Sequence, residues 1–280
     1  MARDTSFSYS FLVLPPAQRR GIGLVWDFCR AVDDAVDEAA DPATAAAEVI
    51  NWRSEVARVF GADEPTTPQG RQLKPYAALF SLSRQPFDDL VDGVEIDLHR
   101  SRYDTFDELI GYCRRVASAV GVMCIEVFGC RDSRSREYAF NLGIALQITN
   151  IIRDVKADLQ QGRIYLPQED LALFGVTEAA LAAGKMTEPV RKLLAYECQR
   201  ARHFYSVAAQ VMPVAESRKL IAAEIMGGIY FEILQRIERR GYDVFTERVR
   251  VPKFVRARIA LQTFALSHLS AFGLTRSARA

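Results

Sequence analysis

The sequence of 280 residues lacks the features that mark several large classes of protein. It contains 5 cysteines, none of which forms a Cys-x-x-Cys pair, and 3 histidines that lie far apart. A structural zinc site and a disulfide framework are therefore not expected, and the free thiols are typical of a protein in a reducing cytoplasm.

The sequence also lacks an excess of charge of one sign and lacks long hydrophobic runs. The 36 Lys and Arg residues are balanced by 35 Asp and Glu residues, which argues against nucleic acid as a partner. No stretch approaches the roughly 18 apolar residues of a membrane-spanning helix. The apolar run Phe11–Leu14 is too short for a secretory signal, which needs about 7–15 apolar residues. We therefore expect a cytoplasmic protein, and we expect any contact with a membrane to be peripheral.

Proline is absent between Pro86 and Pro167, and this absence predicts long helices. Apolar residues recur at helical spacing, whereas the alternation of β-strands is scarce. The sequence thus predicts an all-α protein that forms one domain over residues 1–280, with a flexible tail at about 273–280. The predicted helices are 17–39, 42–60, 71–82, 86–99, 105–129, 136–160, 187–212, 216–240 and 252–272, with a loop at 61–70 and a further helix start at 168.

The first informative stretch places two carboxylates on one helical face. Asp33 and Asp37 are four residues apart, and Arg30 and Trp26 fall on the same side. An apolar stripe runs beside them, so the acids border a buried face. Like charges at this spacing repel, and a cation would relieve the repulsion.

The second stretch is a ladder of oxygen donors. Asn150, Asp154 and Asp158 follow at intervals of four residues on an otherwise apolar helix, and Gln147 extends the line backward. Mg²⁺ prefers oxygen ligands and is usually held by one or two carboxylates together with substrate phosphates. Arginine and lysine side chains that suit phosphate follow nearby in sequence.

Either ladder alone would ordinarily be a solvated acidic face. Two ladders in one all-α chain, each beside an apolar stripe and a basic residue, indicate two metal-binding walls that face each other across a cavity. Metal ions between such walls would bind a diphosphate and stabilise it as a leaving group.

With these stretches the chain resembles the squalene/phytoene synthase family, the head-to-head prenyl transferases, from Ser6 to about Lys253. The motifs that carry the resemblance are Ser6-Phe-Ser-Tyr-Ser-Phe11 with Leu14-Pro-Pro16, Phe28-Cys-Arg-Ala-Val-Asp33-Asp-Ala-Val-Asp37-Glu38, Asp92-Gly-Val-Glu-Ile-Asp97, Leu146-Gln-Ile-Thr-Asn150-Ile-Ile-Arg-Asp154-Val-Lys-Ala-Asp158 with Gly162-Arg-Ile-Tyr-Leu-Pro167, Ile229-Tyr230 and Glu247-Arg-Val249. Within the family the chain is most similar to bacterial presqualene diphosphate synthases.

The resemblance implies an isoprenoid synthase-type helical bundle around a central cavity. Roughly two or three Mg²⁺ ions would bind together with diphosphate. The implied metal ligands are Asp33, Asp37, Asn150, Asp154 and Asp158, and the four aspartates are the implied catalytic residues. The implied substrate-binding residues are Ser6, Phe7, Phe11, Arg30, Gln147, Arg153, Arg163, Tyr165, Tyr230 and Arg248.

The implied reaction is the Mg²⁺-dependent head-to-head condensation of two farnesyl diphosphate molecules to presqualene diphosphate, a precursor of squalene and hopanoids. The isoprenoid diphosphate is the expected partner, and downstream isoprenoid enzymes are further candidates. NADPH is not expected, since Gly21-Ile-Gly23 lacks the third glycine and the preceding strand of a dinucleotide-binding fingerprint.

One departure from the family keeps other products open. Arg114 stands where many members carry a tyrosine that is credited with a part in the first half-reaction. The alternatives are dehydrosqualene, phytoene, squalene, hydroxysqualene or a cyclised terpene, and, outside catalysis, a helical module that only binds isoprenoids. The sequence leaves open the chain length of the substrate, C15 or C20, and the oligomeric state. The basic stretch Arg248–Arg258 is either a solvated helix face or a contact with anionic lipid.

Overall fold

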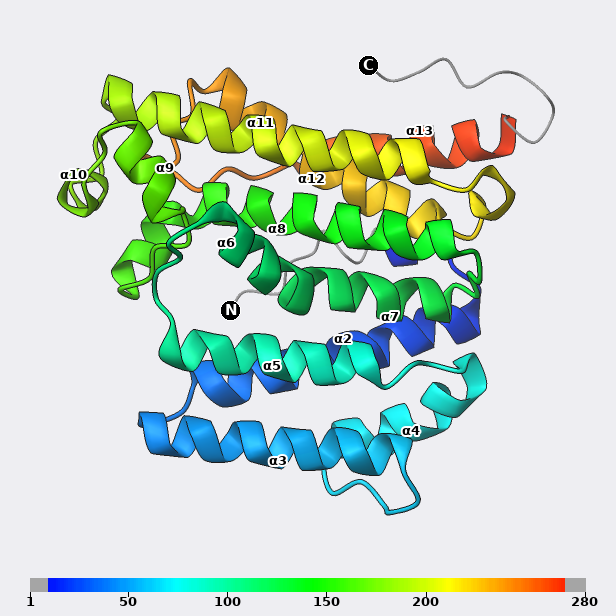
Figure 1. Cartoon of the computed structure of the whole chain (residues 1–280). Coiled ribbons are helices and arrows are strands. Elements are labelled where there is room, and N and C mark those ends of the chain that lie inside the picture. The colour runs from blue at the N-terminus through cyan, green and yellow to red at the C-terminus, as the bar shows by residue number, and fades with distance from the viewer. Residues whose placement is uncertain (1–9, 270–280) are drawn as a thin grey trace.

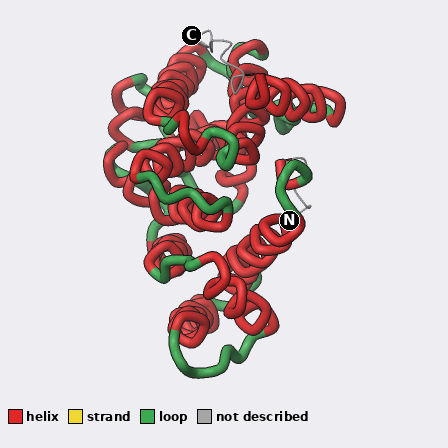
Figure 2. Tube along the Cα trace, turned by 90° about the vertical axis from the view of Figure 1, so that its right-hand side faces the viewer, coloured by secondary structure: helices red, strands yellow, loops and turns green. Residues whose placement is uncertain are grey.

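The computed structural model describes residues 10–269, and helices account for all its regular elements (Figure 1 and Figure 2). Within that range the only extended pairing is an isolated parallel bridge between Arg102 and Ile164. The prediction of an all-α fold is confirmed. Ser6, Phe7 and the tail predicted at about 273–280 lie outside the described residues.

Most helices begin and end within a few residues of the predicted limits. The elements are α2 (Pro16–Asp37), α3 (Pro42–Phe60), α4 (Pro68–Phe80), α5 (Gln85–His99), α6 (Phe106–Cys113), the π-helix η1 (Arg114–Ser118), α7 (Ala119–Val127), α8 (Ser133–Gln160), α9 (Gln168–Leu173), α10 (Glu178–Ala182), α11 (Glu188–Val211), the 3-10 helix η2 (Val214–Glu216), α12 (Ile221–Arg239) and α13 (Lys253–Leu269). The loop predicted at 61–70 is shorter than expected because α4 already begins at Pro68, and the short helix α10 was not predicted.

Side-chain caps explain several helix starts. Thr105 accepts a hydrogen bond from the N–H of Glu108 at 3.3 Å, and the Glu108 carboxylate accepts one from the N–H of Asp104 at 3.0 Å. The Thr105 bond is the N-cap half of the capping box that the sequence predicts, whereas Glu108 reaches the N–H one residue before the N-cap. Asp41 caps α3 in the same way, accepting from the N–H of Thr44 at 2.9 Å.

The helix predicted over 105–129 is interrupted by η1, which was not foreseen. Two glycines allow neighbouring helices to approach η1 closely. A Cβ atom on Gly143 of α8 would lie 2.6 Å from Cα of Ser118, and one on Gly93 of α5 would lie 2.6 Å from Cγ1 of Val116. The wider π-turn therefore sits in a gap that only glycine leaves open, and such turns are frequent at functional sites.

Helix α8 is the central element of the fold (Figure 1). One apolar cluster gathers its C-terminal half with α6 and α9–α13. A second cluster gathers its N-terminal half with α2–α5 and α7. Val13 and Leu146 contact both clusters, so the two cores meet along α8. The acidic stretches of α2 and α8 lie on elements from either side of this junction.

Candidate active site

The C-terminal ends of α2 and α8 lie at the same end of the bundle, at the left in Figure 1. The loop that follows α8 reaches across to α2, where Nη2 of Arg163 lies 3.4 Å from Oδ1 of Asp37. These residues are 126 positions apart in sequence. The two acidic stretches that the sequence singles out are thus brought together by the fold.

A third carboxylate, Asp97 at the end of α5, lies between them. It accepts hydrogen bonds from the hydroxyls of Tyr112 at 2.9 Å and Tyr165 at 3.0 Å. Asp97 ends the motif Asp92–Asp97, which carries part of the family resemblance, but no role was predicted for it. Helical spacing could have identified Asp97, because it follows Leu90 and Val94 at helical intervals. Both of these residues are buried, which places Asp97 on the inner face of α5.

Three tyrosines form an aromatic cluster behind Asp97. The ring centroids of Tyr112 and Tyr165 are 5.3 Å apart, and those of Tyr103 and Tyr165 are 5.9 Å apart. Burial raises the pKa of all three hydroxyls, with the charge of Asp97 adding to the effect. The hydroxyls of Tyr112 and Tyr165 therefore stay protonated and act as donors to Asp97.

The carboxylate of Asp33 is poorly neutralised. Burial first, and then the charges of neighbouring aspartates, raise its pKa to about 7, while Arg30 opposes the shift. The side chain nevertheless keeps an exposed surface. A group that solvent reaches, although protein surrounds most of it, lies in a recess where a cation can approach it.

Asp158 and Asp97 show the same excess of negative charge. Burial and the charge of Asp154 raise the pKa of Asp158 to about 7, although Arg163 and Arg153 act in the opposite direction. Burial raises the pKa of Asp97 to about 6, against Arg163 and the two tyrosine hydroxyls. Three carboxylates from α2, α5 and α8 thus share a region with too little positive charge.

Asp154, one turn before Asp158, is in the opposite state. Arg248 donates to its two oxygens from Nε at 2.7 Å and from Nη2 at 2.9 Å, and Arg153, the preceding residue, donates to both as well. Burial alone would raise its pKa, but these arginines hold it below the usual range. The bidentate geometry is the one by which arginine also binds phosphate.

Two loops hold the arginines in place. Directly after Arg163, the chain is held by the N–H of Ile164, which donates to the carbonyl of Ser101 at 3.0 Å. Before Arg248, Asp243 accepts from the N–H of Thr246 at 3.0 Å, and Lys156 of α8 donates to the carbonyl of Phe245 at 2.7 Å. The guanidinium groups are therefore carried on loops that are tied to the helices around the site.

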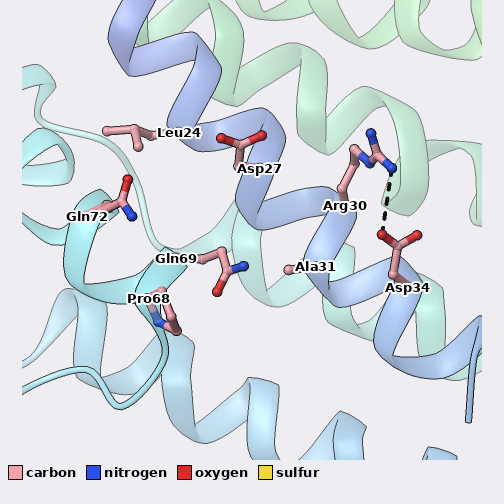
Figure 3. A pocket seen from close by; sticks show the side chains of 8 residues that line it. All are labelled: Leu24, Asp27, Arg30, Ala31, Asp34, Pro68, Gln69 and Gln72. Carbon is pink, nitrogen blue, oxygen red and sulfur yellow. Dashed lines mark ion pairs between the residues drawn. The ribbon is translucent and has the colours of Figure 1, made fainter. Parts of the chain in front are cut away.

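Arg30 lies on the flank of α2 rather than among these arginines. Its Nη2 atom is 3.8 Å from Oδ2 of Asp34, and both side chains line a pocket of about 250 Å³ between α2 and α4 (Figure 3). The pocket is lined by Leu24, Asp27, Arg30, Ala31, Asp34, Pro68, Gln69 and Gln72. The charge of Arg30 still acts on Asp33, so the residue lies at the edge of the site.

The other predicted residues are distributed around α8. Nδ2 of Asn150 lies 3.4 Å from Oε1 of Gln147, whereas Oδ1 of Asn150 is buried and has no hydrogen-bond partner. Tyr230 is buried on α12. Phe11 is half-buried in the segment before α2, next to Ser10, whose hydroxyl contacts the sulfur of Met226 on α12 at 4.0 Å.

The donor set fits a divalent cation that binds together with phosphate. No group of three or more His, Cys, Asp or Glu side chains within the described range is placed to hold a metal ion by itself. Mg²⁺, however, usually takes one or two carboxylates and completes its shell with water and substrate phosphates. The unpartnered oxygen of Asn150 and the un-neutralised carboxylates of Asp33 and Asp158 are the donors such an ion requires.

Comparison with known proteins gives a consistent result. The family model described as squalene/phytoene synthase matches residues 1–255. A phytoene synthase from Arthrospira platensis is 40% identical over 255 residues, which cover 86% of this chain and 82% of the relative.

Two solved structures resemble the whole fold. A dehydrosqualene synthase in complex with ligand superposes with a TM-score of 0.85 at 26% identity, covering 96% of this chain and 93% of the other. The squalene synthase HpnC from Alicyclobacillus acidocaldarius superposes with a TM-score of 0.78 at 33% identity, covering 87% and 92%. The three proteins are thus named phytoene, dehydrosqualene and squalene synthase.

Proposed function

The chain belongs to the squalene/phytoene synthase family, and on this premise we propose that it condenses two allylic prenyl diphosphates head to head to give phytoene. Presqualene diphosphate, the product that the family resemblance favoured, is less well supported, because the relative from Arthrospira platensis and a second one from Synechococcus elongatus, 36% identical, are named phytoene synthases. Phytoene requires C20 substrates, whereas presqualene diphosphate requires C15 substrates.

The observation that carries the proposal is the division of charge at one end of the bundle. Asp33 and Asp158 lack sufficient positive charge, whereas Arg153, Arg163 and Arg248 stand a short distance away. A magnesium diphosphate offers a cation to the former and phosphate oxygens to the latter. The metal would be held by Asp33, Asp37, Asn150, Asp154 and Asp158.

The arginines would exchange partners when substrate binds. Arg248 and Arg163 now pair with Asp154 and Asp37, respectively, and each pairing uses guanidinium N–H groups that also suit phosphate oxygens. Bound Mg²⁺ supplies positive charge that stabilises the departing diphosphate. The side chains of this chain position the diphosphate so that its bond to the allylic carbon breaks while the hydrocarbon lies in a dry, aromatic environment.

The covalent changes balance without a reductant. The allylic carbon of the donor loses its diphosphate and bonds to the C2–C3 double bond of the acceptor, and loss of a proton closes a cyclopropane. Loss of the second diphosphate and of a second proton from the rearranged chain gives phytoene. Squalene, in contrast, requires a hydride from a nicotinamide cofactor in place of the second proton loss.

The test is incubation of the full chain with Mg²⁺ and either geranylgeranyl or farnesyl diphosphate, with and without NADPH, followed by mass spectrometry. We expect a C40 hydrocarbon from the C20 substrate, independent of NADPH. A product from the C15 substrate alone would favour presqualene diphosphate or squalene, the candidate that the similarity to HpnC supports. Unchanged substrates in every incubation would leave the binding module as the better description.

A further inference from the structure

Helix α13 exposes large apolar side chains on its outer side. Its inner side buries Val255 together with Thr263 and Ser267, whereas Phe254 and Leu261 are 75% and 70% exposed. A helix with an ordinary solvated outer face would carry polar residues at the two exposed positions. Part of the outer side of α13 is therefore apolar.

The exposed apolar residues form one continuous stripe. Phe254, Ala257, Leu261 and Phe264 follow at intervals of three or four residues, which places them on the same face of the helix. All four side chains are exposed. A contiguous apolar stripe of this kind marks an interaction surface rather than scattered surface residues.

The charged residues near the stripe indicate which kind of surface it would bind. From Arg248 to the last residue, Ala280, the sequence contains no Asp or Glu. Basic residues gather around the first turns of α13, where Arg250, Lys253 and Arg258 are all exposed. An exposed apolar stripe with aromatic and aliphatic side chains, in a segment whose charged residues are all basic, is the composition of a helix that lies in the interface of an anionic bilayer.

We propose that α13 and the basic segment before it dock this protein onto an anionic membrane surface. The stripe enters the boundary between headgroups and acyl chains, while Arg250, Lys253 and Arg258 contact lipid phosphates. No helix among residues 10–269 is long and apolar enough to cross a bilayer, so α13 lies on the surface. The docking does not depend on the proposed reaction, and it is measured without substrate.

The first test removes the apolar stripe from the full chain. The double variant Phe254→Ser/Leu261→Ser is compared with the unaltered protein in co-sedimentation with vesicles of phosphatidylcholine containing phosphatidylglycerol. We expect the partition coefficient to fall about tenfold or more, since two large apolar side chains no longer enter the bilayer. The matched control is Ile50→Ser/Leu79→Ser, which removes two equally exposed apolar residues from α3 and α4, on the opposite side of the molecule, and leaves binding unchanged (Figure 1).

The second test reverses charge. Arg250→Glu/Lys253→Glu/Arg258→Glu is expected to lower binding to anionic vesicles roughly a hundredfold, and added salt weakens binding by the unaltered protein. The control Lys185→Glu/Lys192→Glu/Arg218→Glu makes the same change in net charge at exposed positions outside α13 and is expected to bind at least ten times better than the α13 variant.

Several results would overturn the inference. The unaltered chain could stay in the supernatant with anionic vesicles, or the α13 variants could bind as well as their controls. A dimer in analytical ultracentrifugation that Phe254→Ser/Leu261→Ser dissociates, without vesicle binding, would assign the stripe to a second copy of the chain. Circular dichroism melts of each variant establish that folding is retained, as expected for exposed positions.

Discussion

The two ends of the bundle hold carboxylates in opposite electrostatic states. At the end where α7 turns into α8, Glu216 accepts hydrogen bonds from the hydroxyl of Ser135 at 2.6 Å, the N–H of Arg131 at 3.0 Å and the ammonium of Lys219 at 2.9 Å. Burial alone would raise its pKa, but these donors lower it to about 2. At the other end, Asp33 and Asp158 have pKa values raised to about 7.

The difference separates an acid that serves folding from acids that we propose bind a ligand. Every oxygen of Glu216 meets a donor supplied by the chain, and the result ties η2 to the start of α8. The carboxylates of Asp33 and Asp158 are buried beside other aspartates whose effect the nearby arginines do not offset. Such an arrangement costs stability and is typical of active sites, where a bound cation relieves it. The raised pKa values of Asp33, Asp97 and Asp158 thus support the site that the motifs indicate.

The largest effect is expected from removing a carboxylate at the site end. Asp33→Asn should lower turnover by about 10² to 10³-fold, the loss typical when a group that stabilises charge in the transition state is removed. Its melting temperature should be unchanged or slightly higher, because the like charges around position 33 no longer repel. Release of diphosphate and a thermal melt measure the two quantities.

The opposite result would contradict the distinction drawn between the two ends of the bundle. If Asp33→Asn kept full turnover and lost its cooperative melt, the carboxylate would be structural, as Glu216 is. Asp34→Asn on the same helix is the matched control: Asp34 pairs with Arg30 beside the α2–α4 pocket, and its loss should cost far less turnover.

An intermediate effect is expected at Asp97, which joins the acidic stretches to the tyrosine cluster. Asp97→Asn should reduce turnover about 10- to 100-fold and raise the Mg²⁺ concentration needed for half-maximal activity, as the loss of an outer-shell carboxylate does in metal sites. Tyr112→Phe removes one hydrogen bond to Asp97 and keeps the ring, so it should reproduce a smaller part of the same shift. An unchanged Mg²⁺ profile for Asp97→Asn would exclude this role.

A substitution at the opposite end of the bundle should lower the stability of the fold without changing turnover. Glu216→Gln removes the charge that Lys219 and the backbone N–H groups meet, and we expect a loss of about 1–3 kcal/mol in the free energy of unfolding. Urea titration measures this loss. Turnover per folded molecule should match the unaltered chain, and a fall comparable to that of Asp33→Asn would show that the two ends are not independent.

Local spacing was enough to predict the helices and both acidic stretches, because helical periodicity and i, i+4 relations are properties of neighbouring residues. What it missed depends on contacts between distant segments. The pairing of Arg248 with Asp154 joins residues 94 positions apart, and that of Tyr165 with Asp97 joins residues 68 apart. The π-helix η1 likewise arises where Gly93 and Gly143 from two other helices approach it.

Those contacts also change what Asp154 is expected to do. Spacing alone treats Asp154 like Asp33, as one of two repelling acids whose removal is neutral for stability. In the fold, Asp154 is the partner of Arg153, whose side chain is only 7% exposed. Asp154→Asn would leave that buried guanidinium without its carboxylate, so this variant should melt at a lower temperature as well as lose turnover.

The smallest effect is a contrast in how the two ends respond to pH. A carboxyl whose pKa is raised on folding contributes stability that is present below its unfolded pKa and is lost as pH rises through the folded value. For Asp33 and Asp158 this loss falls between about pH 4 and pH 7. Glu216, with its lowered pKa, contributes stability above about pH 4.5 that is lost as pH falls toward 2.

Because Asp33 is exposed, solvent screens part of its contribution to stability, so we expect the metal-free protein to melt at only a slightly lower temperature at pH 8 than at pH 6. Asp33→Asn should reduce this difference, and Glu216→Gln should leave it unchanged while flattening the decline at acid pH. Thermal melts of the unaltered protein and the two variants across this pH range test the contrast. An identical pH dependence in all three would contradict the pKa shifts at both ends.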